Sequence, residues 1–163
     1  MIGNYYKNAT DFYGAYPHSY LDRVLSMFPD AINVLHLFSG SLPNTTKGIT
    51  FDINPKLNPM VVGDAHQLSH YFPENVNFEL ILADGPYSRE HALHYGTPMI
   101  HRYKVVSECV KVLAPGGFLI WLDQVFPMFS KKELELVGTI GLIRSTNHRV
   151  RCIFIFRKLQ KGF

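Results

Sequence analysis

Acidic side chains stand at the ends of three short apolar runs in this 163-residue sequence. They are Asp52, Asp64 and Asp84, three of the seven aspartates in the chain. An ionised carboxylate accepts hydrogen bonds and donates none, so each of the three can bind the hydroxyl or amino groups of a polar ligand. Aspartate also caps helix N-termini, and Asp64 fits that role as well as it fits ligand binding. Asp52 fits it less well, because Pro55 and Pro59 leave little room for a helix.

A tight turn, Ser39-Gly40-Ser41, follows the first apolar run. Glycine has no Cβ, so the backbone at Gly40 lets a bound molecule approach closely. The turn is neither the G-x-G-x-x-G dinucleotide fingerprint nor a G-x-x-x-x-G-K-[ST] phosphate loop. A zinc site would need ligand pairs that the two cysteines do not form, and no metal is expected.

Strands and helices alternate along the chain and position these groups. Short apolar runs predict strands at 33–38, 48–53, 59–64, 78–84, 118–122, 138–144 and 150–157. Apolar residues at helical spacing predict helices at 19–29, 65–72 and 98–113. The capping-box pattern Ser130-Lys131-Lys132-Glu133 predicts one further helix start. The apolar stripe of helix 98–113 is predicted to contain Met99, Tyr103, Val106, Val110 and Leu113.

This order of elements is typical of an α/β fold with a mainly parallel sheet covered by helices on both faces. The short polar turn at 145–148 predicts that the last two strands form an antiparallel hairpin at the sheet edge. Ligands of such open sheets bind outside the carboxyl ends of the strands, where the three aspartates and the turn 39–41 fall. Asp52 has the position at which nucleoside sites of this kind place a carboxylate against ribose hydroxyls.

Composition narrows the class of protein. Hydrophobic residues make up 47% of the chain and charged residues 18%, so the chain can bury a core, and residues 1–163 are expected to form one domain. No apolar run approaches the roughly 20 residues that span a bilayer, and the N-terminus lacks the order of a secretion signal. Cys109 and Cys152 stand in apolar stretches, which favours free thiols and a cytoplasmic protein.

Charge is unevenly distributed along the chain. From residue 131 onward eight basic residues stand against two acidic ones, a net charge of +6. The remaining eight basic and eleven acidic residues leave a net charge of −3 for residues 1–130. This asymmetry indicates either an anionic partner that meets the C-terminal third or a strand surface solvated by Lys and Arg.

The segment Ala83-Asp84-Gly85-Pro86-Tyr87 resembles the D/N-P-P-Y/F motif of the amino-directed (N6-adenine and N4-cytosine) DNA methyltransferases. They are a branch of the class I S-adenosylmethionine-dependent methyltransferases, which have a Rossmann-like fold. The order of the other motifs agrees over nearly the whole chain. Segment 34–41 resembles the cofactor loop, 51–54 the acidic end of the second strand, 63–65 the adenine-contacting motif, and 111–118 the L-x-P-G-G turn.

The resemblance implies S-adenosylmethionine as the cofactor. The residues it assigns to cofactor binding are Phe38, Ser39, Gly40, Asp52, Ile53, Asp64, Ala65 and Asp84. Tyr16 and His18 are further candidates, because the family's segment before the first strand walls the methionine end of the cofactor. His36 stands where many relatives carry an acidic residue, and the sequence favours a hydrogen-bonded core histidine there.

The catalytic residues that the resemblance implies are Asp84, Gly85, Pro86 and Tyr87. The Asp84 carboxylate and the Gly85 carbonyl would accept the two N–H groups of an exocyclic amine and align its nitrogen with the methyl donor. Tyr87 would stack on a base swung out of the nucleic acid. The implied function is transfer of a methyl group to an exocyclic amino group of a nucleobase, with DNA binding and DNA methylation as the expected activities.

Two features leave alternatives open. Gly85 replaces the family's first proline, and we expect no separate target-recognition domain within residues 1–163. The chain is therefore also compatible with a non-catalytic, cofactor-binding partner subunit, or with a methyltransferase that acts on a small molecule, RNA or protein. If the chain is a nucleobase methyltransferase without a target-recognition domain, a homodimer or a partner subunit would supply target recognition. Asp123, at the end of the fifth predicted strand, is expected to shape the substrate mouth.

Overall fold

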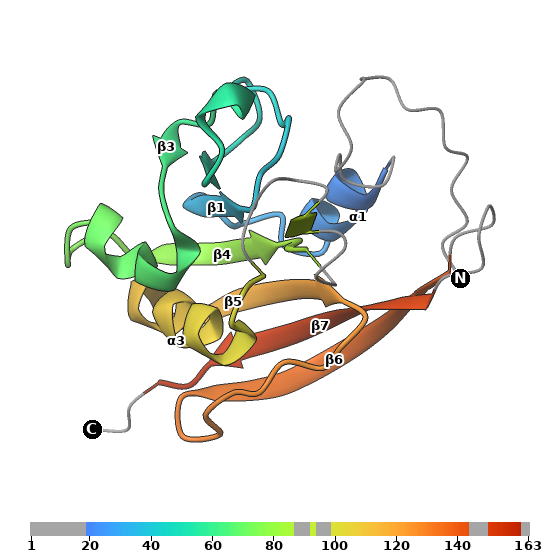
Figure 1. The fold of residues 1–163 in the computed structure, drawn as a ribbon. Coiled ribbons are helices and arrows are strands. Elements are labelled where there is room, and N and C mark those ends of the chain that lie inside the picture. Colours follow the sequence, from blue (N-terminus) through green and yellow to red (C-terminus); the bar gives the residue numbers. More distant parts are fainter. Residues whose placement is uncertain (1–18, 87–91, 94–98, 144–149, 161–163) are drawn as a thin grey trace.

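A computed structural model describes residues 19–86, 92–93, 99–143 and 150–160 (Figure 1). Its seven-stranded sheet has the order β3-β2-β1-β4-β5-β7-β6. The strands are β1 (Val34–Leu37), β2 (Ile49–Asp52), β3 (Val61–Val62), β4 (Phe78–Ala83), β5 (Leu113–Asp123), β6 (Leu134–Ile143) and β7 (Val150–Lys158). β1 to β5 pair in parallel, whereas β7 is antiparallel to both β5 and β6. The predicted fold class, with its C-terminal hairpin, is confirmed.

Helices cover both faces of this sheet. Successive side chains of a strand point to opposite faces, and in β4 Leu80 and Leu82 join one core while Ile81 and Ala83 join the other. The first core lies under helix α1 (Tyr20–Ser26). The second lies under helix α3 (Arg102–Val112) and the 3₁₀ segment η2 (Ala65–Tyr71). A short 3₁₀ turn, η1 (Pro55–Leu57), follows β2. No helix among the described residues is long and apolar enough to cross a membrane.

The prediction that a helix starts at Ser130 is wrong. The Ser130 carbonyl accepts hydrogen bonds from the backbone N–H groups of Glu133 and Leu134, and this tight turn leads directly into β6. Packing explains the difference, because Phe126 and Phe129 lie on β7 aromatic side chains and cover the sheet face without a helix. The local capping pattern is overruled by this aromatic cluster.

Three other predicted boundaries also shift. Helix α3 begins at Arg102 rather than 98, and Tyr103 of the predicted stripe is exposed while the helix buries Val105 and Cys109 instead. Segment 65–72 is a 3₁₀ segment with a kink at Gln67, not one regular helix. The predicted turn 114–117 lies within β5, whose pairing with β4 is irregular at this point.

Candidate functional site

The carboxyl ends of β1 to β4 meet at one edge of the sheet. The register aligns Leu37 with both Phe51 and Ala83, and Asp52 with Val62, so the residues that follow these strands lie side by side. This edge brings together the predicted residues Phe38, Ser39, Gly40, Asp52, Ile53, Asp64, Ala65, Asp84, Gly85 and Pro86. Tyr16, His18 and Tyr87 lie outside the described residues.

Asp52 holds the loop after β1 in place. Its Oδ2 accepts a hydrogen bond from the Gly40 N–H at 2.9 Å, and its Oδ1 accepts one from the Asn54 N–H at 2.9 Å. The N-cap of η1 is Asn54, not Asp52, so the helix-cap alternative for Asp52 does not hold. Phe38 and Gly40 both have a left-handed backbone, with φ of 59° and 56°. For Phe38 this conformation costs about 1 kcal/mol, which the Asp52 contact to the loop offsets.

Asp64 is a helix N-cap, and its carboxylate stays accessible to a ligand. As N-cap of η2 it accepts hydrogen bonds at Oδ1 from the His66 N–H at 2.9 Å and from His66 Nδ1 at 2.7 Å. Its side chain is nevertheless 40% exposed, so a ligand can reach the carboxylate. Partial burial raises the pKa of Asp64, but the hydrogen bonds from His66 and the nearby Lys104 charge outweigh it and hold the pKa below its ordinary value.

His66 connects this aspartate to helix α3, a link that sequence analysis missed. The His101 backbone N–H donates to His66 Nε2 at 2.9 Å, so the proton of the neutral ring lies on Nδ1, facing Asp64. His101 is in turn the N-cap of α3 and accepts a hydrogen bond from the Lys104 N–H. The only local signal was the pair of histidines themselves, because the contact joins elements far apart in the chain.

Packing explains why a residue without a side chain stands at position 85, where the resembling motif has proline. A Cβ at Gly85 would lie 2.9 Å from Ile100 Cδ1 and 3.1 Å from the Phe38 ring. Real Cβ atoms essentially never come within 3.0 Å of another atom, so Ile100 would have to move, and the Phe38 ring would have to shift by a few tenths of an ångström. Phe38 therefore packs against the segment that follows β4 and couples the first loop of the edge to Asp84 and Gly85.

Asp84 lies in a nearly buried polar cluster. Its side chain is 11% exposed, and its Oδ1 lies 3.8 Å from Nη1 of Arg151, which is 7% exposed. Tyr20 of α1 is buried close to both charges. Burial raises the pKa of the Tyr20 phenol, and the negative charge of Asp84 raises it further against the opposing charge of Arg151. The Tyr20 hydroxyl is therefore close enough to feel the charges of both Asp84 and Arg151.

Asp123 does not shape a substrate mouth, contrary to expectation. Its buried carboxylate pairs with Arg102 through Nε at 2.7 Å and Nη2 at 3.2 Å. It also accepts hydrogen bonds from the Trp121 indole at 3.1 Å and from the backbone N–H groups of Gln124 and Val125. With these five contacts, Asp123 ties the start of α3 to the end of β5 and serves the fold.

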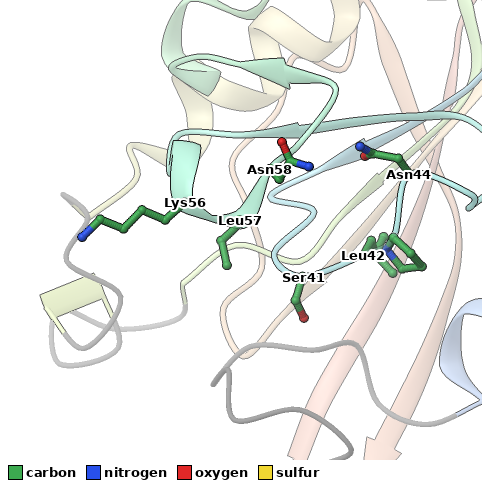
Figure 2. Close-up of a pocket in the computed structure, with 7 residues that line it drawn as sticks. Ser41, Leu42, Asn44, Lys56, Leu57 and Asn58 are labelled. Atoms are coloured by element: carbon green, nitrogen blue, oxygen red, sulfur yellow. The ribbon is translucent and has the colours of Figure 1, made fainter.

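A small pocket lies next to the loop that follows Gly40. It has a volume of about 180 Å³ and is lined by Ser41, Leu42, Pro43, Asn44, Lys56, Leu57 and Asn58. Figure 2 shows the loop residues on one side and the η1 residues on the other. Small-molecule sites usually measure about 300 Å³ or more, so this hollow alone does not hold a nucleoside-sized ligand.

Two buried groups on or near the first loop differ in their partners. His36 lies in the core and its Nε2 contacts the Lys47 carbonyl at 2.8 Å. Burial lowers the pKa of His36, only partly opposed by that hydrogen bond, so the ring is a neutral core histidine as the sequence favoured. The buried hydroxyl of Ser39 has no hydrogen-bond partner among the described residues, and neither has Nδ1 of His36. Buried hydroxyls normally have one, and a polar ligand on this loop would supply it.

Three of the eight basic residues of the C-terminal third have partners within the folded chain. Lys158 donates from Nζ to the carbonyls of Val110 and Leu113 and so caps the end of α3. Arg157 lies over the Phe118 ring at 6.0 Å, and Arg151 faces Asp84. Lys131 and Lys132 are exposed. Only some of the basic side chains in the C-terminal third are therefore open to an anionic partner.

Comparison with known proteins gives matches among solved structures alone. No protein-family model and no curated protein matches this sequence. TrmN from Thermus thermophilus has a TM-score of 0.64 and 17% identity over 90% of this chain and 50% of that chain. The N-methyltransferase NodS from Bradyrhizobium japonicum WM9, in complex with S-adenosyl-L-homocysteine, has a TM-score of 0.57 and 16% identity over 88% and 86%. An rRNA methylase from Streptococcus thermophilus has a TM-score of 0.57 and 10% identity over 86% and 96%.

The shared architecture defines the class of fold. It is the Rossmann-like fold of the class I S-adenosylmethionine-dependent methyltransferases, as the sequence motifs implied. Some of these structures contain S-adenosylhomocysteine, the demethylated form of the cofactor, which indicates S-adenosylmethionine as the cofactor of the fold. The chain spans half the length of TrmN. At these sequence identities the similarity shows the fold alone. Substrate and activity have to be inferred from the residues of the site.

Proposed function

We propose that this chain is an S-adenosylmethionine-dependent N-methyltransferase that acts on an exocyclic amino group of a nucleobase, with DNA as the expected substrate. The observation that carries the proposal is the position of Asp84-Gly85-Pro86 at the end of β4, packed against Phe38 of the loop after β1. Ligands of open parallel sheets bind at this edge. The segment that resembles the amine-binding motif therefore adjoins the segment that resembles the cofactor loop.

The residues at the edge fit a nucleoside cofactor. Asp52 and Asp64 offer carboxylates, Gly40 offers a backbone without a Cβ, and the Ser39 hydroxyl is a buried polar group without a partner among the described residues. Asp52 would accept from ribose hydroxyls and Asp64 from the adenine amino group, with Ile53 and Ala65 beside the ring. Tyr16 and His18 are proposed to wall the methionine end. When bound, S-adenosylmethionine supplies a sulfonium methyl group, and transfer yields the N-methyl product, S-adenosylhomocysteine and a proton.

Asp84 and Gly85 are proposed to activate the substrate amine. The lone pair of an exocyclic amine is delocalised into the base, so the amine is a weak nucleophile. Hydrogen bonds from its two N–H groups to the Asp84 carboxylate and the Gly85 carbonyl return electron density to nitrogen and fix its direction. Pro86 stiffens the backbone after that carbonyl, and Tyr87 is proposed to stack on the base.

RNA is the second candidate substrate. The similarity to an rRNA methylase covers 86% of this chain and 96% of that chain, so a protein of this size and fold is described as an RNA methylase. We further propose that residues 1–163 act as one domain, and that a second copy or a partner subunit supplies target recognition. A cytoplasmic location, where nucleic acid and cofactor are both available, is part of the same proposal.

Calorimetry and a methyl-transfer assay test the proposal together. The chain is titrated with S-adenosylmethionine and is then assayed with a radiolabelled methyl donor on DNA and on RNA, with product nucleosides identified by mass spectrometry. N-methylated adenine or cytosine from DNA supports the proposal, and the same product from RNA alone selects the second candidate. Binding of the cofactor without transfer to either polymer would overturn the proposal and would leave a non-catalytic subunit or a methyltransferase for a small molecule or protein. Binding to DNA that falls steeply with salt is the accompanying expectation.

A further inference from the structure

Arg151 lies at the candidate site although it comes from the opposite end of the chain. It is the second residue of β7, and because β7 runs antiparallel to the other strands its start lies at their carboxyl edge. Its neighbour Cys152 pairs with Asp123 at the end of β5. Ile153, two residues further on, belongs to the core under α1, so Arg151 points to that same face. The C-terminal hairpin thus places the Arg151 guanidinium at the carboxyl edge of the sheet.

The guanidinium and the Asp84 carboxylate form a nearly buried ion pair. The distance of 3.8 Å from Nη1 to Oδ1 is that of an ion pair rather than a direct hydrogen bond. Arginine stays protonated in proteins, so it brings a permanent positive charge to a place that water hardly reaches. An unpaired charge there is costly, and the two groups therefore determine each other's position.

We propose that Arg151 is a positioning residue that holds the Asp84 carboxylate ionised and oriented for the substrate amine. This inference rests on the proposed function, which makes Asp84 the acceptor of one amine N–H. The guanidinium meets Oδ1 from the α1 side of the sheet, and this contact sets the direction of the remaining oxygen. An ionised carboxylate can only accept a hydrogen bond, whereas a protonated one would donate and would turn the amine away.

The test compares the variants Arg151→Gln and Arg151→Lys with the wild-type chain. In Arg151→Gln we expect kcat to fall about 30- to 100-fold, as for misplacement of a reacting group by about 1 Å, while KM and cofactor affinity stay within about 3-fold. Arg151→Lys keeps the charge and should recover most of kcat. Arg157→Gln is the matched control, because it makes the same change on the same strand at the far edge of the sheet.

A double-mutant cycle with Asp84→Asn separates positioning from general support of the fold. The asparagine oxygen still accepts a hydrogen bond but carries no charge for Arg151 to hold. Adding Arg151→Gln to Asp84→Asn should therefore change kcat by less than about 3-fold. A loss of kcat in this background as large as in the wild type, or a loss of cofactor affinity as large as the loss of kcat, would overturn the inference.

Crystal structures of the same variants supply a readout that does not depend on activity. The Asp84 carboxylate should keep its orientation in Arg151→Lys and turn in Arg151→Gln. An unchanged orientation in Arg151→Gln overturns the inference, whatever the assays show. If the wild-type chain binds the cofactor but transfers no methyl group, the proposed function fails separately, and the orientation of Asp84 still decides the role of Arg151.

Discussion

Two aspartates at the ends of neighbouring strands, a buried one and a half-buried one, have different surroundings. Asp84 follows β4, Asp123 ends β5, and each faces an arginine. Asp123 receives five N–H contacts at 3.2 Å or less, and its side chain is 2% exposed. Asp84 meets its arginine at 3.8 Å and keeps 11% of its side chain exposed at the edge. The fully enclosed Asp123 carboxylate supports the fold, whereas the partly exposed Asp84 carboxylate is open to a ligand at the edge.

The largest effect is expected from Asp84→Ala. Removing the acceptor for the amine should lower the rate of methyl transfer about 10²- to 10³-fold, while cofactor affinity stays within about 3-fold. Labelled methyl transfer and calorimetry measure the two quantities. Asp30→Ala, at an exposed position, is the control. Equal loss of transfer and cofactor binding would show that Asp84 supports the fold as Asp123 does.

Asp123→Ala, unlike Asp84→Ala, should lower stability and leave methyl transfer nearly unchanged. It leaves Arg102 and the Trp121 indole without their acceptor, and loss of one partner of a buried ion pair costs about 3 kcal/mol of unfolding free energy. Urea denaturation measures this loss. Transfer per folded molecule should stay within about 3-fold at low temperature. Normal stability together with lost transfer would instead support the sequence-based expectation that Asp123 shapes the substrate mouth.

Gly85→Ala sharpens the comparison, because Gly85 adjoins Asp84 while Ile100 leads into the helix held by Asp123. The new methyl group would push Ile100 and Phe38 away, at a cost of about 1–3 kcal/mol in stability and with weaker cofactor binding through Phe38. Thermal unfolding and calorimetry record both. Gly141→Ala is the matched control, since nothing lies within 4 Å of its added Cβ, and it should be neutral. Equal results for the two glycines would exclude the packing explanation for Gly85.

The smallest effect is expected for Asp64→Asn, because this third aspartate is the most exposed. Its pKa is below the ordinary 3.8, so the ionised form stabilises the fold above that pH and the stabilisation is lost as the pH falls through the folded-state pKa. The difference in unfolding free energy between wild type and Asp64→Asn should stay under about 1 kcal/mol near pH 7 and shrink toward pH 3. Urea titrations at several pH values measure it. A difference that grows in acid would contradict the assignment.

Local patterns predicted the sheet well and the helices less well. Short apolar runs, and the turn residues that end them, located all seven strands and the C-terminal hairpin, because these signals lie within each segment. The signal at Ser130 failed because the capping pattern is equally local, while the contact that overruled it joins Phe129 to Phe156. The same limit explains Tyr103, whose exposure depends on what α3 packs against.

The amino-acid sequence by itself determined which carboxylates end the strands, and the motif order that indicates a methyltransferase fold. Only the tertiary structure decided what each carboxylate does. Pairing of Asp123 with Arg102, packing of Phe38 over Gly85, and approach of Arg151 to Asp84 all join residues that are distant in the chain. Such contacts arise from strand register and side-chain packing, and no short stretch of sequence contains them.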